Sequence, residues 1–172
     1  MTAELQEVRF NGGILKRGFW LYVWEITPPN GGALYYVGRT GDSSSTNAQS
    51  PFNRMGQHLG FAENSNMLRR HLLKHGANPE QCGFRLVALG PLEAESKADT
   101  RHQHDMRRDL VASMEKALAE LMSAAGCQVM NQVISRKPLD TLRFAEVRAA
   151  FTRSFPVLEI LSERKQDGCD EI

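Results

Sequence analysis

The sequence predicts an α/β protein of the α+β type, with a small, mostly antiparallel, three-stranded sheet flanked by helices. Two stretches rich in aromatic and β-branched residues, 18–27 and 33–40, predict neighbouring strands because a strong turn signal, PPNGG, lies between them. A later stretch, 93–126, has apolar residues at helical spacing, which predicts one long helix. The chain of 172 residues, 41% of them hydrophobic, is long enough to bury one core.

The remaining elements follow from local signals. Ser50 is a good N-cap and Pro51 a good first helical residue, so a helix is expected directly after the serine-rich loop. Gly76 and Gly126 close two further helices, and Pro156 stops the last one. The predicted elements are, in chain order, strands 18–27 and 33–40, helices 51–59 and 64–76, strand 83–90, helix 93–126, a brief extended piece at 127–133 and helix 139–155.

The chain divides into three predicted parts. Residues 1–17 form an N-terminal extension, 18–136 the main domain, and 137–172 a C-terminal helical extension with a polar tail. The first residues lack the basic and apolar regions of a signal peptide, and no apolar run is long enough to span a membrane, so no membrane association is expected. The formal net charge of +1 gives no indication of a nucleic-acid partner, so any basic surface must arise from folding.

The cysteine pattern indicates the compartment. Cys82, Cys127 and Cys169 are odd in number and widely spaced, and they lack the paired spacing of a metal site. They are therefore expected to be reduced thiols in a cytoplasmic protein.

The adjacent tyrosines Tyr35 and Tyr36 must point to opposite faces of their strand. If the aliphatic face that includes Val23 and Val37 packs against helices, Tyr35 packs with it, and Tyr36 shares the other face with Tyr22. Two phenolic hydroxyls on one open sheet face could meet a ligand or a phosphate. The alternative is that both are amphipathic sheet residues whose hydroxyls contact water.

Three further side chains are candidates for chemistry. Arg54 and His58 are four residues apart and project from one helical face, where an arginine can bind phosphate and a histidine can move a proton. Glu115 borders the apolar stripe of the long helix, and a carboxylate at the edge of a core usually has a partner such as an arginine, a backbone group or a metal. The alternative for Arg54 and His58 is a solvated helix face.

Two histidine-containing segments have simpler interpretations. His102 and His104 lack further residues spaced as zinc ligands, so both are expected to face solvent. The segment RRHLLKH is equally compatible with a phosphate-contact face and with a solvated helix; its cationic candidates are Arg69, Arg70, Lys74 and His75.

The candidate residues form an ordered set along the chain: Tyr22, the YVG motif of Tyr36 to Gly38, Arg54 with His58, Glu115 and Asn131. This set resembles the GIY-YIG nuclease domain family. The resemblance covers about residues 18–133 and has two departures: Trp20 stands in place of the first motif's glycine, and a charged segment lengthens the approach to the glutamate.

This resemblance implies a GIY-YIG-like fold over 18–136 and a metal-dependent endonuclease that hydrolyses DNA phosphodiester bonds. One divalent ion, Mg or Mn, would be held by Glu115. Tyr22 is the implied general base or its relay to water, and Tyr36 would position water or phosphate. Arg54 would stabilise the developing charge.

The other matching positions have supporting roles. His58 would share the proton transfer, and Asn131 would brace the site by hydrogen bonds. Gly38 would allow the phosphate to approach the backbone closely, and Arg39 is a weaker candidate for phosphate contact. The alternative function is a catalytically silent GIY-YIG-like module that binds nucleic acid or a protein partner.

Overall fold

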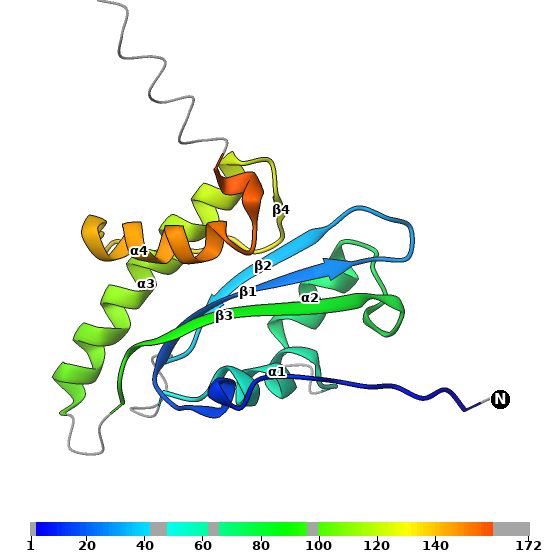
Figure 1. Cartoon of the computed structure of the whole chain (residues 1–172), viewed down its shortest axis with the longest axis horizontal. Coiled ribbons are helices and arrows are strands. Elements are labelled where there is room, and N and C mark those ends of the chain that lie inside the picture. Colours follow the sequence, from blue (N-terminus) through cyan, green and yellow to red (C-terminus); the bar gives the residue numbers. More distant parts are fainter. Residues whose placement is uncertain (1–2, 42–47, 62–65, 96–99, 160–172) are drawn as a thin grey trace, which may run out of the picture.

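The computed structural model describes residues 3–41, 48–61, 66–95 and 100–159. Across these residues the chain forms one four-stranded mixed sheet flanked by helices (Figure 1), which confirms the α+β class. The order in the sheet is β3-β1-β2-β4, and β4 is parallel to β2 whereas the other pairs are antiparallel. The strands are β1 (Phe19–Thr27), β2 (Leu34–Arg39), β3 (Gly83–Glu93) and β4 (Gln128–Val129).

The predicted count of three strands is wrong because part of the extended piece at 127–133 pairs with β2. Only two residues of this piece form the ladder, Leu34 with Gln128 and Tyr35 with Val129. So short a strand leaves no alternation in the sequence by which to recognise it.

Four helices and three short 3-10 helices occur in the described ranges. Ser50 caps the first helix as predicted, because its side chain accepts a hydrogen bond from the backbone N–H of Asn53 at 3.3 Å. Gly76 follows the second in a left-handed conformation. The helices are α1 (Pro51–Leu59), α2 (Met67–Lys74), α3 (Arg101–Ala124), α4 (Thr141–Thr152), η1 (Gly12–Leu15), η2 (Pro79–Gln81) and η3 (Pro156–Leu158).

The boundary between β3 and α3 differs from the prediction. β3 continues to Glu93, and α3 begins only at Arg101. Thr100 and Gln103 form a capping box, in which each side chain accepts the backbone N–H of the other residue. This local signal fixes the start of α3, whereas residues 96–99 lie outside the described ranges.

The two faces of the sheet pack against different helices (Figure 1). Val23 and Val37 face α3 and α4, and Tyr35 packs against the same cluster, as predicted. Tyr22 and Tyr36 share the opposite face. That face is not open, because α2 and partly buried residues of α1 cover it. The expectation of wet phenols on an exposed sheet face is therefore wrong.

The prediction for the two histidines of α3 holds for His102, which is exposed, but not for His104. His104 is buried, and its ring lies 5.1 Å from that of Phe19. It lies seven residues before Val111, so it occupies the core-facing stripe of α3.

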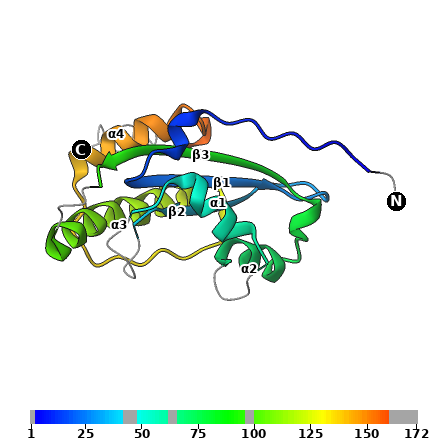
Figure 2. The same ribbon diagram turned by 90° about the horizontal axis from the view of Figure 1, so that it is seen from below.

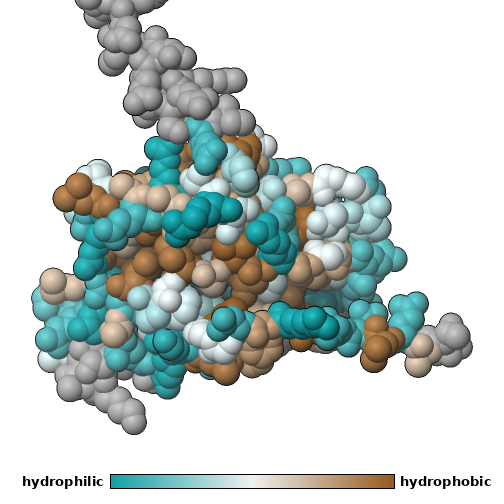
Figure 3. All heavy atoms as spheres, viewed as in Figure 1, coloured by the Kyte–Doolittle hydropathy of each residue, from teal (hydrophilic) through white to brown (hydrophobic). Residues whose placement is uncertain are grey.

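Two features of the exterior are the N-terminal segment and a hydrophobic region of the surface. The segment before η1 runs away from the body in both ribbon views (Figure 2). Hydrophobic residues gather near the centre of the face in Figure 3, and the middle of the edge strand β3 is only partly buried. Within the described ranges, no helix is both long and apolar enough to cross a bilayer.

Candidate active site

A small cavity of about 100 Å³ gathers most of the predicted site residues. Residues from β1, β2, α1 and α3 contribute to it, so both helical layers of the domain supply side chains. The sequence separates these residues by up to 93 positions, so only the fold brings them together. The cavity is lined by Tyr22, Tyr36, Gly38, Arg39, Arg54 and Glu115.

Tyr22 and His58 form the central polar contact behind the cavity wall. The Tyr22 hydroxyl lies 2.7 Å from Nε2 of His58, and the two rings meet edge to face. Both side chains are almost fully buried. Nδ1 of His58 has no hydrogen-bond partner in the described part of the chain. His58 therefore reaches the cavity through Tyr22 and does not line it.

Burial sets the protonation of this pair. It raises the pKa of Tyr22 well above its usual 10, although the positive charge of Arg54 opposes the rise. Burial, together with Arg54, lowers the pKa of His58 to about 4. At neutral pH the phenol keeps its proton and the imidazole is neutral. The charge of Arg54 by itself does not bring the pKa of Tyr22 below its usual value.

Tyr36 lies between two histidines. Its ring centroid is 5.2 Å from that of His58 and 5.7 Å from that of His71, which belongs to α2. Burial, reinforced by the negative charge of Glu115, raises the pKa of Tyr36 to about 12. Sequence reasoning missed His71, although its position one residue before the buried Leu72 placed it at the border of the apolar stripe of α2.

Glu115 and Arg39 form an ion pair across the cavity. Oε2 of Glu115 lies 2.9 Å from Nε of Arg39, and the Arg39 guanidinium also donates to the backbone carbonyl of Gly41. Burial raises the pKa of Glu115 to about 7, despite the opposing charges of Arg39 and Arg54. The partner expected for Glu115 is thus an arginine from the end of β2.

Glu115 is the residue of this cavity through which a hard divalent ion would bind. Glu115 is the carboxylate that lines the cavity, and no group of three or more His, Cys, Asp or Glu residues suited to a metal occurs in the described residues. Mg²⁺ commonly binds through one or two carboxylates and keeps several waters. Burial raises the pKa of Glu115 more than Arg39 and Arg54 lower it, so the carboxyl is partly protonated near pH 7.

Position 38 requires a glycine because the ring of its cross-strand partner, Tyr22, fills the space that a side chain would occupy. Gly38 pairs with Tyr22 in the hairpin register, and a Cβ atom built at Gly38 would lie 2.5 Å from the Tyr22 ring. The missing side chain of Gly38 makes room for the phenol ring of Tyr22, and the approach of a phosphate to this backbone stays a prediction.

Asn131 braces β2 from the segment after β4. Its Oδ1 accepts from the backbone N–H of Val37 at 3.0 Å, and its Nδ2 donates to the Val37 carbonyl at 2.7 Å. Asn131 is not among the residues that line the cavity in the described ranges. It holds the strand between Tyr36 and Gly38 in place, which is the bracing role expected for it.

The RRHLLKH segment of α2 has mixed surroundings. Arg69 lies 3.6 Å from Glu80, and its guanidinium is 4.3 Å from the ring centre of Phe61. Lys74 is exposed.

No family model, curated protein or solved structure matches the chain. The proposed function therefore rests on the geometry of the site.

Proposed function

We propose that this protein is a metal-dependent endonuclease that hydrolyses phosphodiester bonds of DNA. One observation carries the proposal: two phenols, two guanidinium groups and a carboxylate converge on a cavity of about 100 Å³. A phosphodiester resists attack because its negative charge repels nucleophiles and its leaving alkoxide is poor. A site that hydrolyses it needs fixed positive charge and a route for the proton of the attacking water.

The two arginines would provide the fixed charge. Arg54 projects from α1 into the cavity and would contact the non-bridging phosphate oxygens, where negative charge develops. Arg39 would share this contact once its ion pair with Glu115 opens. The phenol of Tyr36 keeps its proton at neutral pH, so it would donate a hydrogen bond that orients the water or the phosphate.

Tyr22 and His58 would carry the proton. The attacking water gives a proton to the Tyr22 oxygen while the hydroxyl proton of Tyr22 passes to Nε2 of His58, 2.7 Å away. The water oxygen bonds to phosphorus as the bond to the leaving oxygen breaks. The leaving oxygen takes a proton from bulk water, and His58 returns its proton through Tyr22 to the solvent. A divalent ion held by Glu115 would supply charge neutralisation at the phosphate and the leaving oxygen.

The simplest test is cleavage of supercoiled plasmid by the purified chain with Mg or Mn, with a chelated reaction as control. Nicked or linear product that depends on the ion supports the proposal. Intact plasmid with either ion, over a range of protein concentration, contradicts it. We also expect the protein to act in the cytoplasm, because Cys82 and Cys127 are free thiols.

A catalytically silent module that binds nucleic acid is the second candidate. The ion pair between Arg39 and Glu115 favours it, because a carboxylate that already has a cationic partner can persist without a metal. Plasmid binding without cleavage at any ion concentration would support this candidate.

A further inference from the structure

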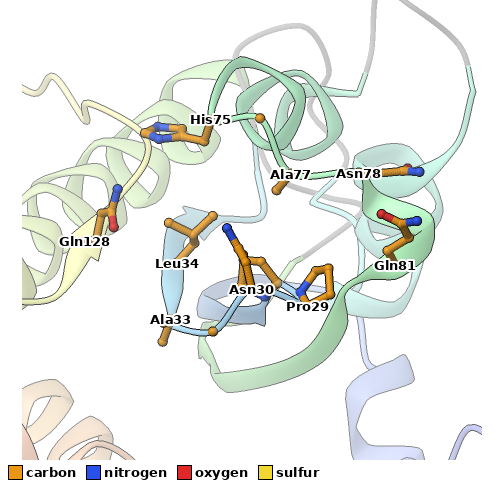
Figure 4. Close-up of a pocket in the computed structure, with 13 residues that line it drawn as sticks. Pro29, Asn30, Ala33, Leu34, His75, Ala77, Asn78, Gln81 and Gln128 are labelled. Atoms are coloured by element: carbon orange, nitrogen blue, oxygen red, sulfur yellow. The ribbon is translucent and has the colours of Figure 1, made fainter.

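A second hollow, of about 430 Å³, lies at the far end of the β1–β2 hairpin from Gly38. The turn at 28–34 forms one wall, and the connection after α2, at 75–78, forms another. Gln81 of η2 and Gln128 of β4 complete the lining (Figure 4). The hollow is thus separate from the active-site cavity, although both are built on β2.

The lining of this hollow is polar but uncharged. It contains no Asp, Glu, Lys or Arg. In Figure 4 the amide of Asn30 points into the space between the turn and the α2 connection, and Ala77 lies above it. The polar side chains are the amides of Asn30, Asn78, Gln81 and Gln128 and the imidazole of His75.

We propose that this hollow binds an unpaired nucleobase of the strand whose phosphate occupies the active-site cavity. A side-chain amide presents a donor and an acceptor in one plane, which matches the paired donor and acceptor atoms on the edge of a base. Pro29, Leu34 and Ala77 add apolar surface for the face of the ring. A lining without fixed charge suits a neutral heterocycle and not a phosphate.

The two sites lie along one strand and are more than one nucleotide apart. Leu34 lines the hollow and Gly38 lines the cavity, and four residues of a strand span about 13 Å. His71 of α2 contacts the Tyr36 ring, and His75, directly after α2, lines the hollow. Lys74 lies beside this row and places positive charge near the path of the backbone.

This inference rests on the proposed function and narrows its substrate. A base inside a duplex is stacked and paired, so it enters such a hollow only after extrusion, which costs energy. DNA with unpaired nucleotides near the cleaved bond avoids that cost. A single strand, a loop or a flap is therefore the preferred class of substrate over a fully paired duplex.

Fluorescence anisotropy in EDTA tests the inference without any need for cleavage. Labelled single-stranded DNA and a blunt duplex of equal length are compared for wild type, for the double variant Asn30→Ala/Gln81→Ala, and for Gln6→Ala as an exposed amide control. We expect wild type to bind the single strand about tenfold more tightly, and the double variant to lose most of that preference. Equal affinity of wild type for both DNAs, or an unchanged preference in the double variant, would overturn the inference.

Photocrosslinking of wild type to single-stranded DNA with a 5-iodouracil base gives a second readout that needs no variant. Crosslinks within 28–34 or 75–81 support the base site, whereas crosslinks confined to other segments contradict it. Plasmid cleavage without a preference for unpaired DNA would remove the base site and leave the nuclease proposal intact. Binding of single strands that depends on the amides, without any cleavage, would support the base site and contradict the nuclease proposal.

Discussion

The hydroxyl of Tyr22, on β1, lies 2.7 Å from Nε2 of His58, on α1, and both side chains are buried. Burial and the charge of Arg54 lower the pKa of His58 to about 4, so the imidazole is neutral at neutral pH and is a weak proton acceptor. In the proposed mechanism, Tyr22 passes the proton of the attacking water to His58 through this contact.

Removal of the Tyr22 hydroxyl is the first test of that relay. Tyr22→Phe is expected to slow single-turnover DNA cleavage by about 10²–10⁴-fold, because the attacking water loses its proton acceptor. It also leaves the buried His58 without its hydrogen bond, at a cost of about 1–3 kcal/mol in unfolding free energy.

Tyr35→Phe is the matched control, because the Tyr35 hydroxyl is on the other face and contacts Glu25 at 3.5 Å. It should retain nearly the full cleavage rate. A similar rate loss in both variants would argue against the relay.

The raised pKa of Glu115 predicts a pH-dependent stability. The pKa of Glu115 is about 7 in the folded chain and 4.5 for an ordinary exposed glutamate, so stability falls as the pH rises through this window. The loss attributable to Glu115 is on the order of 3 kcal/mol at most. Urea unfolding of wild type and Glu115→Gln between pH 5 and pH 8, without metal, should show the difference growing in favour of the variant.

His58 has the opposite effect, since its lowered pKa removes stability as the pH falls, but it is present in both proteins and cancels in the difference. A difference in unfolding free energy that stays constant across the pH range would contradict the burial of an ionisable Glu115.

The close contact between Gly38 and Tyr22 predicts that substitutions at these two positions have non-additive effects on the free energy of unfolding. Gly38→Ala places a methyl group against the Tyr22 ring and should cost about 1–3 kcal/mol in unfolding free energy. In a Tyr22→Ala background the same change should cost much less, because the ring is gone.

Gly56→Ala serves as control, because nothing lies within 4 Å of the added atom in the middle of α1. It should be neutral or stabilise by about 0.5–1 kcal/mol. Additive effects of Gly38→Ala and Tyr22→Ala would rule out the close packing of these two residues.

The two hydrogen bonds between the Asn131 amide and the Val37 backbone predict that both the oxygen and the nitrogen of the amide contribute to stability. Asn131→Ala leaves the Val37 N–H and carbonyl without their hydrogen-bond partner. If no water replaces the amide, each unsatisfied group should lower the free energy of unfolding by about 1–3 kcal/mol. Asn131→Asp retains the acceptor but places a second acceptor against the Val37 carbonyl, so it should destabilise comparably. Thermal unfolding measures both, and a fully stable aspartate variant would show that the donor atom is dispensable.

Local patterns predicted the elements and the faces of the central strands. The alternation that sends Tyr35 to one helical layer and Tyr36 to the other has a period of two, and it survives in the structure. The cap at Ser50 and the stop at Gly76 depend only on neighbouring residues, so they were predictable as well. The four-residue spacing of Arg54 and His58 likewise placed both on one side of α1.

Relationships across the fold could not be predicted in the same way. The pairing of Arg39 with Glu115 depends on how α3 crosses the end of β2, which no local pattern encodes. The space above Gly38 is filled by a ring from the neighbouring strand, and it takes the strand register to show this. The burial of His104 followed from the stripe of α3, but its polarity favoured an exposed interpretation.

The central claim, that Glu115 and its neighbours form a working nuclease site, is tested most directly by plasmid cleavage across a series of Mg and Mn concentrations. Wild type, Glu115→Gln and the control Glu120→Gln are compared, because Glu120 is an exposed acid on the same helix. Wild type and Glu120→Gln should nick the plasmid at similar rates, and Glu115→Gln should be slower by at least about 10²-fold at every ion concentration. Equal cleavage by Glu115→Gln and wild type would contradict the account.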